Sequence, residues 1–418
     1  MDLTKEQRET LLGKIQALVS EKYYDPAFDK STWDGIVQRH RPAVISASDA
    51  ATFETAITDM LTELSPRSLG LLSERSKINP RNAINASFSV QMLDGGLRWV
   101  FQDVLPGGVA EKAGVQTGDV LLTAAGKEML PSSEKAIEPP FEMHHTIPVT
   151  VSRGNPQEIA TLSLSTGNPK YKDNPYSELT AVTSRSVNGV AYLRVSLFQG
   201  KVGIDFANQL DSLFRDSFAS TDNLIIDLRG NPGGGIGGLA LMSYLTPNRL
   251  PIGYSKNRQM AEKRIDPSAF PKFDKVPRSR FAIPGLALKF MGKTSVYLYT
   301  EGMGNKAYHG TTVILVNEHT TGAAEMVAQF AQENRLATIV GSRTPGRLVS
   351  RKASKLGFGY RLVIPVAAYV SAKGTQIEGK GITPNVEVPW SFKDATAGRD
   401  NQLDAALEQV STANRRAS

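Results

Sequence analysis

One histidine and two threonines lie together just before a predicted helix, and they are the side chains best suited to chemistry in this chain. His319, Thr320 and Thr321 precede a run of small residues that begins at Ala323. A threonine hydroxyl becomes a nucleophile when a base takes its proton, which makes Thr321 a candidate nucleophile and His319 its candidate base. The alternative is structural, because threonines also cap helices and His319 is then an ordinary loop histidine.

A second candidate is the glycine-rich turn that follows a short apolar strand. The turn reads Asp227-Leu228-Arg229-Gly230-Asn231-Pro232-Gly233-Gly234-Gly235. Consecutive glycines let a ligand approach the backbone closely, because no Cβ stands in the way. Such a turn can offer amides to an oxyanion or cradle a phosphate. The lysine of a phosphate-binding Walker motif is missing, and this weakens the phosphate alternative.

Metal and cofactor chemistry find little support. His144 and His145 are adjacent, and adjacent residues on a strand point to opposite faces, so the pair does not predict a metal site. The chain has no cysteine, which excludes disulfides, thiolate metal sites and a cysteine nucleophile. We therefore expect neither a metal nor a cofactor.

The elements that position these residues change in character along the chain. Residues 1–64 show helical spacing of apolar positions, with Thr4 and Gln7 as a capping box and Asp49 as a further cap. From about residue 86 to 165, short strand-like runs alternate with turns. From about residue 180, strands alternate with helices, which predicts an α/β core. Residues 247–300 are rich in proline and lysine, and we expect a lid or substrate-facing loop rather than core.

The strand-rich segment contains a motif of its own. The run Pro106–Leu121 is similar to the signature of PDZ domains found in proteases. The resemblance implies capture of a peptide C-terminus as an added strand, with its carboxylate held by backbone amides. The matching carboxylate loop is Ala83–Phe88, which lacks the usual glycines, so peptide capture and a packing role both stay open. We expect an extended loop over Leu130–His145.

Three later segments together resemble the core of the carboxyl-terminal processing (tail-specific) serine peptidases. They are the glycine-rich turn at 227–235, the run Val316–Val327 and the run Ala337–Arg347, and the closing segment Ile377–Asn385 agrees as well. The resemblance implies a crotonase-like βα core with an N-terminal helical region and an inserted PDZ-like β domain. The expected domains are 1–80 (helical), 81–167 (PDZ-like) and 168–418 (peptidase-like α/β core).

The same resemblance implies roles for single positions, and three of them are occupied by residues that cannot fill those roles. The nucleophilic serine falls at Gly322, and the general-base lysine falls at Arg347, which stays protonated at neutral pH. Some relatives use a histidine instead, and Ser68 stands in its place. The oxyanion hole is implied at Gly233, Gly234 and Ala323, and Ala323 begins a helix whose dipole favours an anion.

These positions leave three functions open. The first is a pseudopeptidase that binds polypeptides, or a small acyl-bearing ligand, in a degenerate cleft. The second is a hydrolase whose nucleophile has moved, with Thr321 in that role. The third is a non-proteolytic lyase, isomerase or cyclase that reuses the oxyanion hole, because a fold does not fix a function.

Charge and hydropathy set the remaining expectations. The formal charge is +7, with Lys and Arg along the whole chain, which can favour acidic partners or membrane surfaces but lacks the interleaved aromatics of nucleic-acid binding. No apolar run is long enough for a membrane span. No apolar signal core follows Met1, so the chain as written predicts a cytoplasmic protein, or a periplasmic one if a signal was removed.

Overall fold

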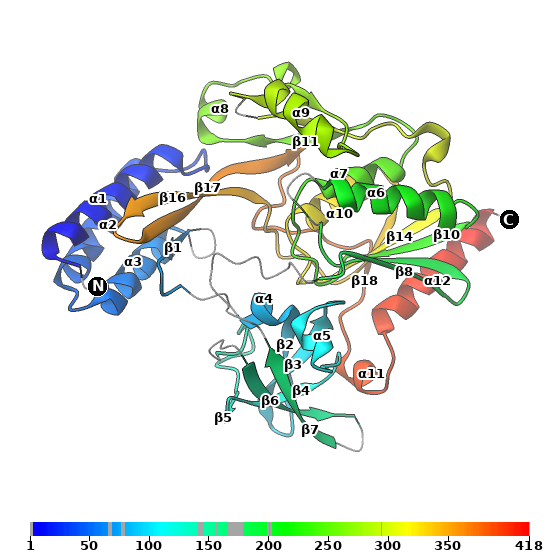
Figure 1. Cartoon of the computed structure of the whole chain (residues 1–418), viewed down its shortest axis with the longest axis horizontal. Coiled ribbons are helices and arrows are strands. Elements are labelled where there is room, and N and C mark those ends of the chain that lie inside the picture. Colours follow the sequence, from blue (N-terminus) through cyan, green and yellow to red (C-terminus); the bar gives the residue numbers. More distant parts are fainter. Residues whose placement is uncertain are drawn as a thin grey trace.

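The computed structural model describes residues 3–65, 69–76, 80–140, 146–154, 158–165, 179–198, 200, 203–293 and 295–417. Ser68, at the position implied for a histidine base, and the His144–His145 pair lie outside the described residues. The described residues form a mixed α/β protein with three six-stranded sheets (Figure 1). None of the described helices is both long and apolar enough to cross a bilayer.

The N-terminal helices pack against a hairpin from the far end of the chain. Thr4 forms the expected capping box and Asp49 caps the third helix. Trp33 and Phe53 are fully buried in one core with Leu362 of the hairpin, so the helices do not close a core of their own. The elements are α1 (Lys5–Lys22), α2 (Lys30–Ser46), α3 (Ala50–Leu64), β1 (Gly70–Leu72), β16 (Val349–Gly357) and β17 (Tyr360–Ser371).

The hairpin extends into a sheet that includes much of the proline- and lysine-rich segment. Residues 247–300 were expected as a loop outside the core, but they supply three strands to this sheet, in the order β1-β17-β11-β13-β12, with β16 beside β17. Backbone pairing to β17, in the register Tyr254↔Val370, overrides the segment's loop-like composition. Its elements are β11 (Pro251–Lys256), α8 (Arg258–Glu262), β12 (Lys272–Phe273), α9 (Ile283–Phe290) and β13 (Tyr297–Tyr299).

The strand-rich segment forms a separate antiparallel sheet with its own core. The strand order is β2-β3-β4-β6-β7, with β5 beside β4, and Trp99 and Phe101 are buried beneath the short helix α5. Residues 130–140, in the expected loop, contain no helix or strand. The elements are α4 (Pro80–Ile84), β2 (Ala86–Leu93), β3 (Gly96–Val104), α5 (Val109–Lys112), β4 (Val120–Ala124), β5 (Lys127–Glu128), β6 (Thr146–Arg153) and β7 (Glu158–Ser165).

The third sheet is the α/β core that carries the glycine-rich turn. Its order is β18-β15-β14-β10-β9-β8, and β14, β10 and β9 run parallel. One face packs on α6, α7 and α10, and the other on α12 (Figure 1). The elements are β8 (Val182–Val187), β9 (Val190–Val195), α6 (Ile204–Ser212), η1 (Leu213–Ser217), β10 (Asn223–Asp227), α7 (Gly237–Tyr244), β14 (Thr311–Val316), α10 (Ala323–Glu333), β15 (Thr338–Gly341), β18 (Val386–Glu387), α11 (Phe392–Thr396) and α12 (Asn401–Ala417).

Candidate functional site

Two turns meet at one edge of the core sheet because β10 and β14 are neighbouring parallel strands. The carboxyl ends of parallel strands lie at the same edge, where α/β proteins usually bind ligands. The pairing Asp227↔Leu315 sets the two turns side by side. The Thr321 amide donates to the Asn231 carbonyl at 2.9 Å, and the Thr320 hydroxyl donates to the Leu228 carbonyl at 2.9 Å. The glycine-rich turn and the 317–322 turn are therefore tied together through backbone groups.

Gly322 adopts a backbone conformation that side-chain-bearing residues rarely adopt. Its φ is 63° and its ψ is −126°, and it is the N-cap of α10. Hydrolases of the α/β-hydrolase fold expose their serine on a similarly sharp, strained strand-to-helix turn. A Cβ at Gly322 would lie 3.5 Å from Gly233 Cα and 3.5 Å from the Pro232 carbonyl, which is ordinary contact. The turn thus has room for a small side chain where the sequence has none.

The amides around Gly322 divide into those that are occupied and those that are available. The Gly233 amide donates to Asn231 Oδ1 at 2.7 Å, so it cannot also serve an oxyanion in this conformation. Among the described residues, the Gly234 and Ala323 amides donate to no protein acceptor. A Cβ on Gly233 would lie 3.0 Å from the Ala323 nitrogen. Of the three amides expected to serve an oxyanion, those of Gly234 and Ala323 therefore have no protein acceptor among the described residues.

Glu325 is a fully buried carboxylate that joins Gly322 to the segment carrying the base position. Its Oε2 accepts from the Gly322 amide at 3.1 Å and from the Arg347 amide at 2.8 Å. Its Oε1 accepts from the Thr344 hydroxyl at 2.6 Å and from the Gly346 amide at 2.7 Å. Burial raises the pKa of the Glu325 carboxyl, and these four donors oppose that shift. Glu325 thus positions the backbone at Gly322 and at Arg347, the positions that the resemblance implies for the nucleophile and the general base.

The two threonines do not act as the expected caps. Thr320 accepts from the Asn317 amide at 2.9 Å, and its buried hydroxyl is committed to the turn. Gly322 is the N-cap instead, and the Glu325 carboxylate accepts from its amide. Thr321 lines the cavity described next, whereas His319 is buried and does not line it. Among the described residues, no hydrogen bond joins the Thr321 hydroxyl to His319.

A cavity of about 630 Å³ opens over this turn, a volume within the usual range for ligand pockets. Its walls come from the two turns, from the start of β16 and from the module of β2–β7. Gly322 and Ala323 lie at its wall, and Arg347 and Arg351 line it from the side of β16. The lining residues from the other module are Asn82, Ile137 and Glu138.

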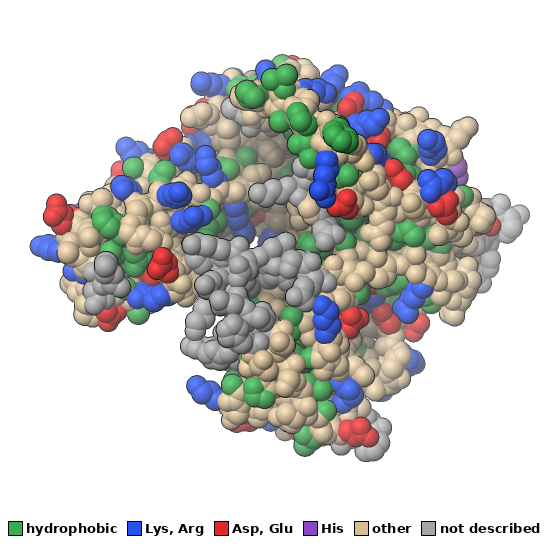
Figure 2. Space-filling view, in the orientation of Figure 1, with side chains coloured by type: hydrophobic (Ala, Val, Ile, Leu, Met, Phe, Trp, Pro, Cys, Tyr) green, Lys and Arg blue, Asp and Glu red, His purple; other side chains and the backbone are tan. Residues whose placement is uncertain are grey.

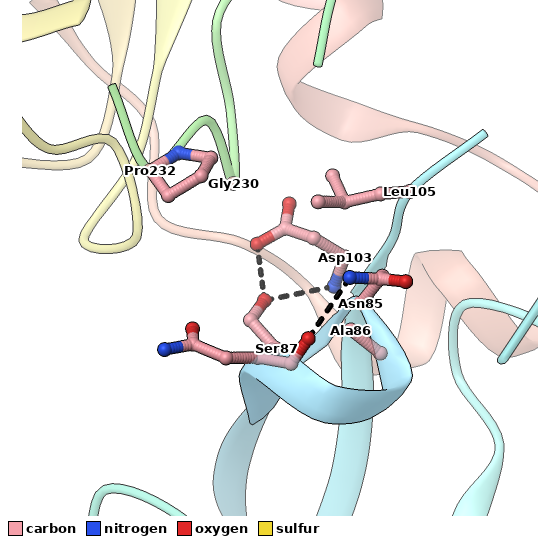
Figure 3. Close-up of a pocket in the computed structure, with 8 residues that line it drawn as sticks. Asn85, Ala86, Ser87, Asp103, Leu105, Gly230 and Pro232 are labelled. Atoms are coloured by element: carbon pink, nitrogen blue, oxygen red, sulfur yellow. Dashed lines mark hydrogen bonds between the residues drawn. The ribbon is translucent and has the colours of Figure 1, made fainter. Parts of the chain in front are cut away.

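The β2–β7 module is fastened to the candidate site through a buried polar contact (Figure 3). Asp103, on β3, points toward Gly230, and its carboxylate accepts from the Ser87 hydroxyl. Asn317 donates its side-chain amide to both Asp103 oxygens, at 2.9 and 3.0 Å, and accepts from the Gly230 amide at 2.9 Å. Beside it, Gln102 donates to Glu318 Oε1 at 2.7 Å. The module therefore contacts both turns of the site.

A buried ion-pair network surrounds Asp227, the first residue of the glycine-rich turn. Asp227 pairs with Arg194 at 2.8 Å and with Arg229 at 2.7 Å, and Arg229 also pairs with Asp400 of the C-terminal segment at 2.7 Å. Tyr192 donates its hydroxyl to Asp227 at 2.5 Å. Burial alone would raise the pKa of Asp227, but Arg194 and Arg229 hold it well below its usual value. The network holds the start of the glycine-rich turn in place. None of its residues lines the cavity over Gly322.

No cluster of three or more His, Asp or Glu side chains suited to a metal is found among the described residues. Sequence reasoning missed the positioning roles of Glu325, Asp103 and Asn317. The one signal for Glu325 was its place three residues after Gly322, where a glutamate commonly bonds back to the N-cap amide.

Comparisons with known proteins find similarity to peptidases. Residues 189–388 match the model of peptidase family S41. The carboxyl-terminal-processing protease of Synechocystis sp. is 26% identical over 97% of this chain and 87% of its own length. The carboxy-terminal-processing protease of Bartonella bacilliformis is 24% identical over 94% of this chain and 83% of its own.

Solved structures show the same fold. The photosystem II D1 C-terminal processing protease superimposes with a TM-score of 0.54 at 18% identity, covering 93% of this chain and 94% of that one. A putative S41 protease from Bacteroides fragilis gives a TM-score of 0.56 at 16% identity, over 95% and 97% of the two chains. Residues 189–388 therefore match a peptidase family S41 domain, and the similarity to carboxyl-terminal-processing proteases over most of the chain supports that family.

Proposed function

We propose that this protein binds polypeptide in the cleft over Gly322 and does not cleave it by the serine mechanism of its family. One observation carries the proposal. The turn at residue 322 has the sharp strand-to-helix conformation that presents a nucleophilic serine in hydrolases, but the residue there is a glycine without a side chain. Gly322 has the strained conformation, with φ 63°, and the neighbouring Gly234 and Ala323 amides are available as donors. A substrate carbonyl can accept from those two amides, but no hydroxyl at residue 322 can attack it.

The base position supports the same proposal. Arg347 carries the backbone amide that binds Glu325, and its side chain lines the cavity. A guanidinium keeps its proton at neutral pH and cannot activate a hydroxyl or water. The alternative of a non-proteolytic enzyme is not favoured, because the relatives described above carry protease names.

We further propose that the β2–β7 module is PDZ-like and that the core is crotonase-like. The module's position supports a part in polypeptide binding, since Asn82 and Ile137 reach the cavity wall. A polypeptide bound to the module would enter the cleft at this wall.

The first test asks whether any nucleophile survives. We expect no labelling of the protein by a fluorophosphonate probe, and covalent modification of Thr321 would instead establish a displaced nucleophile. The variant Gly322→Ser should restore little cleavage of an unstructured peptide, because Arg347 offers no base. The double variant Gly322→Ser/Arg347→Lys should gain measurable cleavage, since it replaces both missing groups on the retained backbone.

The second test asks whether the cleft binds peptide. Fluorescence anisotropy with a labelled unstructured peptide should show binding to the unmodified chain. Gly233→Ala should weaken that binding at least tenfold, because its Cβ would push the 231–235 turn away from Ala323. Gly374→Ala is the matched control, since its Cβ meets nothing within 4 Å. Equal affinities of the unmodified chain, Gly233→Ala and Gly374→Ala would mean that the peptide binds outside the cleft over Gly322. Tighter binding of a free C-terminal carboxylate than of its amide would support the PDZ-like assignment.

A further inference from the structure

The positive charge of the chain is concentrated in one segment. Residues 247–300 contain eleven Lys and Arg against three Asp and Glu, a net charge of +8. The whole chain carries +7, so all other residues together carry −1. Some of the cations are used internally: Arg249 pairs with Asp274, and Arg278 pairs with Asp211. Others are exposed and form no ion pair among the described residues, namely Lys263, Arg264, Lys275, Arg280, Lys289 and Lys293.

Helix α9 in this segment is apolar on two opposite faces, and only one face is covered. Leu286 and Phe290 pack against the main core. On the other face Leu288 is 72% exposed, and the two apolar residues that flank the helix, Phe281 in the preceding 3₁₀ turn Arg280–Ala282 and Met291 at the C-cap, are 96% and 69% exposed. The three exposed apolar side chains thus come from α9 and from the residues directly before and after it. A helix that is apolar all round is normally buried on all sides, and this one is not.

The apolar residues and the cations are neighbours. Arg280 directly precedes Phe281, while Lys289 and Lys293 flank Met291 in sequence, and all three cations are exposed. Figure 2 shows hydrophobic and Lys or Arg side chains together over the region of α9 at the top of the molecule. We call these six residues, Phe281, Leu288, Met291, Arg280, Lys289 and Lys293, the α9 face. Exposed apolar side chains set among cations are typical of helices that lie in the headgroup region of a membrane.

We propose that the α9 face docks on the surface of an anionic phospholipid bilayer. The three apolar side chains enter the boundary between headgroups and acyl chains, and the three cations contact the negatively charged headgroups. The net charge of the segment favours a bilayer over a second copy of the chain as the occupant of the α9 face. A second copy would bring the same +8 segment against itself if it docked face to face, and like charges there oppose association.

The experiment is vesicle cosedimentation with the full chain. Sucrose-loaded vesicles of phosphatidylcholine alone are compared with vesicles containing about 30% phosphatidylglycerol, at low and high salt. We expect binding only to the anionic vesicles, weakened by salt. Lys289→Gln/Lys293→Gln should lower the partition coefficient roughly 30-fold, since each cation near the surface contributes about a fivefold factor. Phe281→Ser/Leu288→Ser should lower it at least tenfold.

Two control variants match these changes elsewhere on the surface. Lys127→Gln/Lys355→Gln removes the same charge from exposed positions outside the α9 face, and Met92→Ser/Ile159→Ser removes apolar side chains that are 61% and 71% exposed. Both should bind vesicles like the unmodified chain. Equal losses in test and control variants would overturn the proposal, and so would the absence of vesicle binding. Dimerisation in sedimentation experiments that is lost only in Phe281→Ser/Leu288→Ser, without vesicle binding, would assign the face to a second copy instead.

Discussion

Replacing Gly233 by alanine tests the close approach of the two turns that form the site. The φ of Gly233 is +94°, where an L-residue is strained, and strain of this kind costs about 1–3 kcal/mol. The added Cβ would also lie 3.0 Å from the Ala323 nitrogen and 3.0 Å from the Thr321 carbonyl oxygen. These are backbone atoms of a half-buried turn, which cannot swing aside as a side chain can, and overpacking of this kind costs about 1–3 kcal/mol more.

A second glycine separates the two contributions. Gly374 has φ +83°, and a Cβ there would meet nothing within 4 Å. Gly374→Ala should therefore lose only the strain, about 1–3 kcal/mol of unfolding free energy, and Gly233→Ala about 2–6 kcal/mol. The quantity of interest is the difference, about 1–3 kcal/mol.

Guanidinium unfolding followed by circular dichroism measures the free energies, and hydrogen–deuterium exchange locates the effect. The amides at the start of α10 should exchange faster in Gly233→Ala and at the unmodified rate in Gly374→Ala. Equal destabilisation by the two substitutions, with no change of exchange in α10, would refute the close approach of the turns on which the site is built.

Three other perturbations follow from the buried contacts. Asp227→Asn should destabilise the core by about 3–5 kcal/mol, because it leaves the buried Arg194 without its charge partner and leaves Arg229 paired with Asp400 alone. The lowered pKa of Asp227 means that its stabilisation is present above the unfolded pKa of about 4 and is lost as pH falls below it, so urea titrations of the two proteins should converge in acid. Asp103→Ala should make the β2–β7 module more susceptible to limited proteolysis, since the Asn317 side-chain amide loses its acceptor at a cost of about 1–3 kcal/mol; Ser89→Ala, on the same module, should not. Glu325→Gln should lower the unfolding free energy by about 1–3 kcal/mol, because the new side-chain NH2 group would face the backbone amides that now donate to the carboxylate. An unchanged midpoint of urea unfolding would contradict the role of Glu325 in positioning Gly322 and Arg347.

Local signals predicted the helices and the site turns well, because their causes lie within a few residues. Thr4 and Asp49 cap helices as their side chains predict. The glycine-rich turn and Gly322 also lie where the motifs place them.

Non-local pairing explains what the sequence did not predict. The segment at 247–300 looked like a loop because its prolines and lysines are poor strand formers, yet its strands are held by β17. The strand β16 was missed because its solvent-facing residues are mostly charged and polar, and only its partner β17 makes it a strand. The threonine caps failed because Thr320 bonds across to Leu228, a residue 92 positions away.

The site shows the same division between local and distant causes. Gly233, Gly234 and Ala323 could be named from motifs, but which of their amides is occupied depends on the side chain of Asn231. The link through Asp103 and Asn317 joins residues 214 positions apart, and no pattern in a single sequence indicates such a pair.

The N-terminal helices share their core with a hairpin made near the other end of the chain, and this affects how the protein is synthesised. The helices α1–α3 leave the ribosome with their apolar faces uncovered, and Leu362, which completes their core, follows about 300 residues later. At about 5–20 residues per second, that interval lasts about 15–60 seconds. During this time Trp33 and Phe53 have no native partner on the hairpin. We therefore expect the nascent chain to depend on chaperones at its N-terminus, and a chain truncated before β16 to expose that surface permanently.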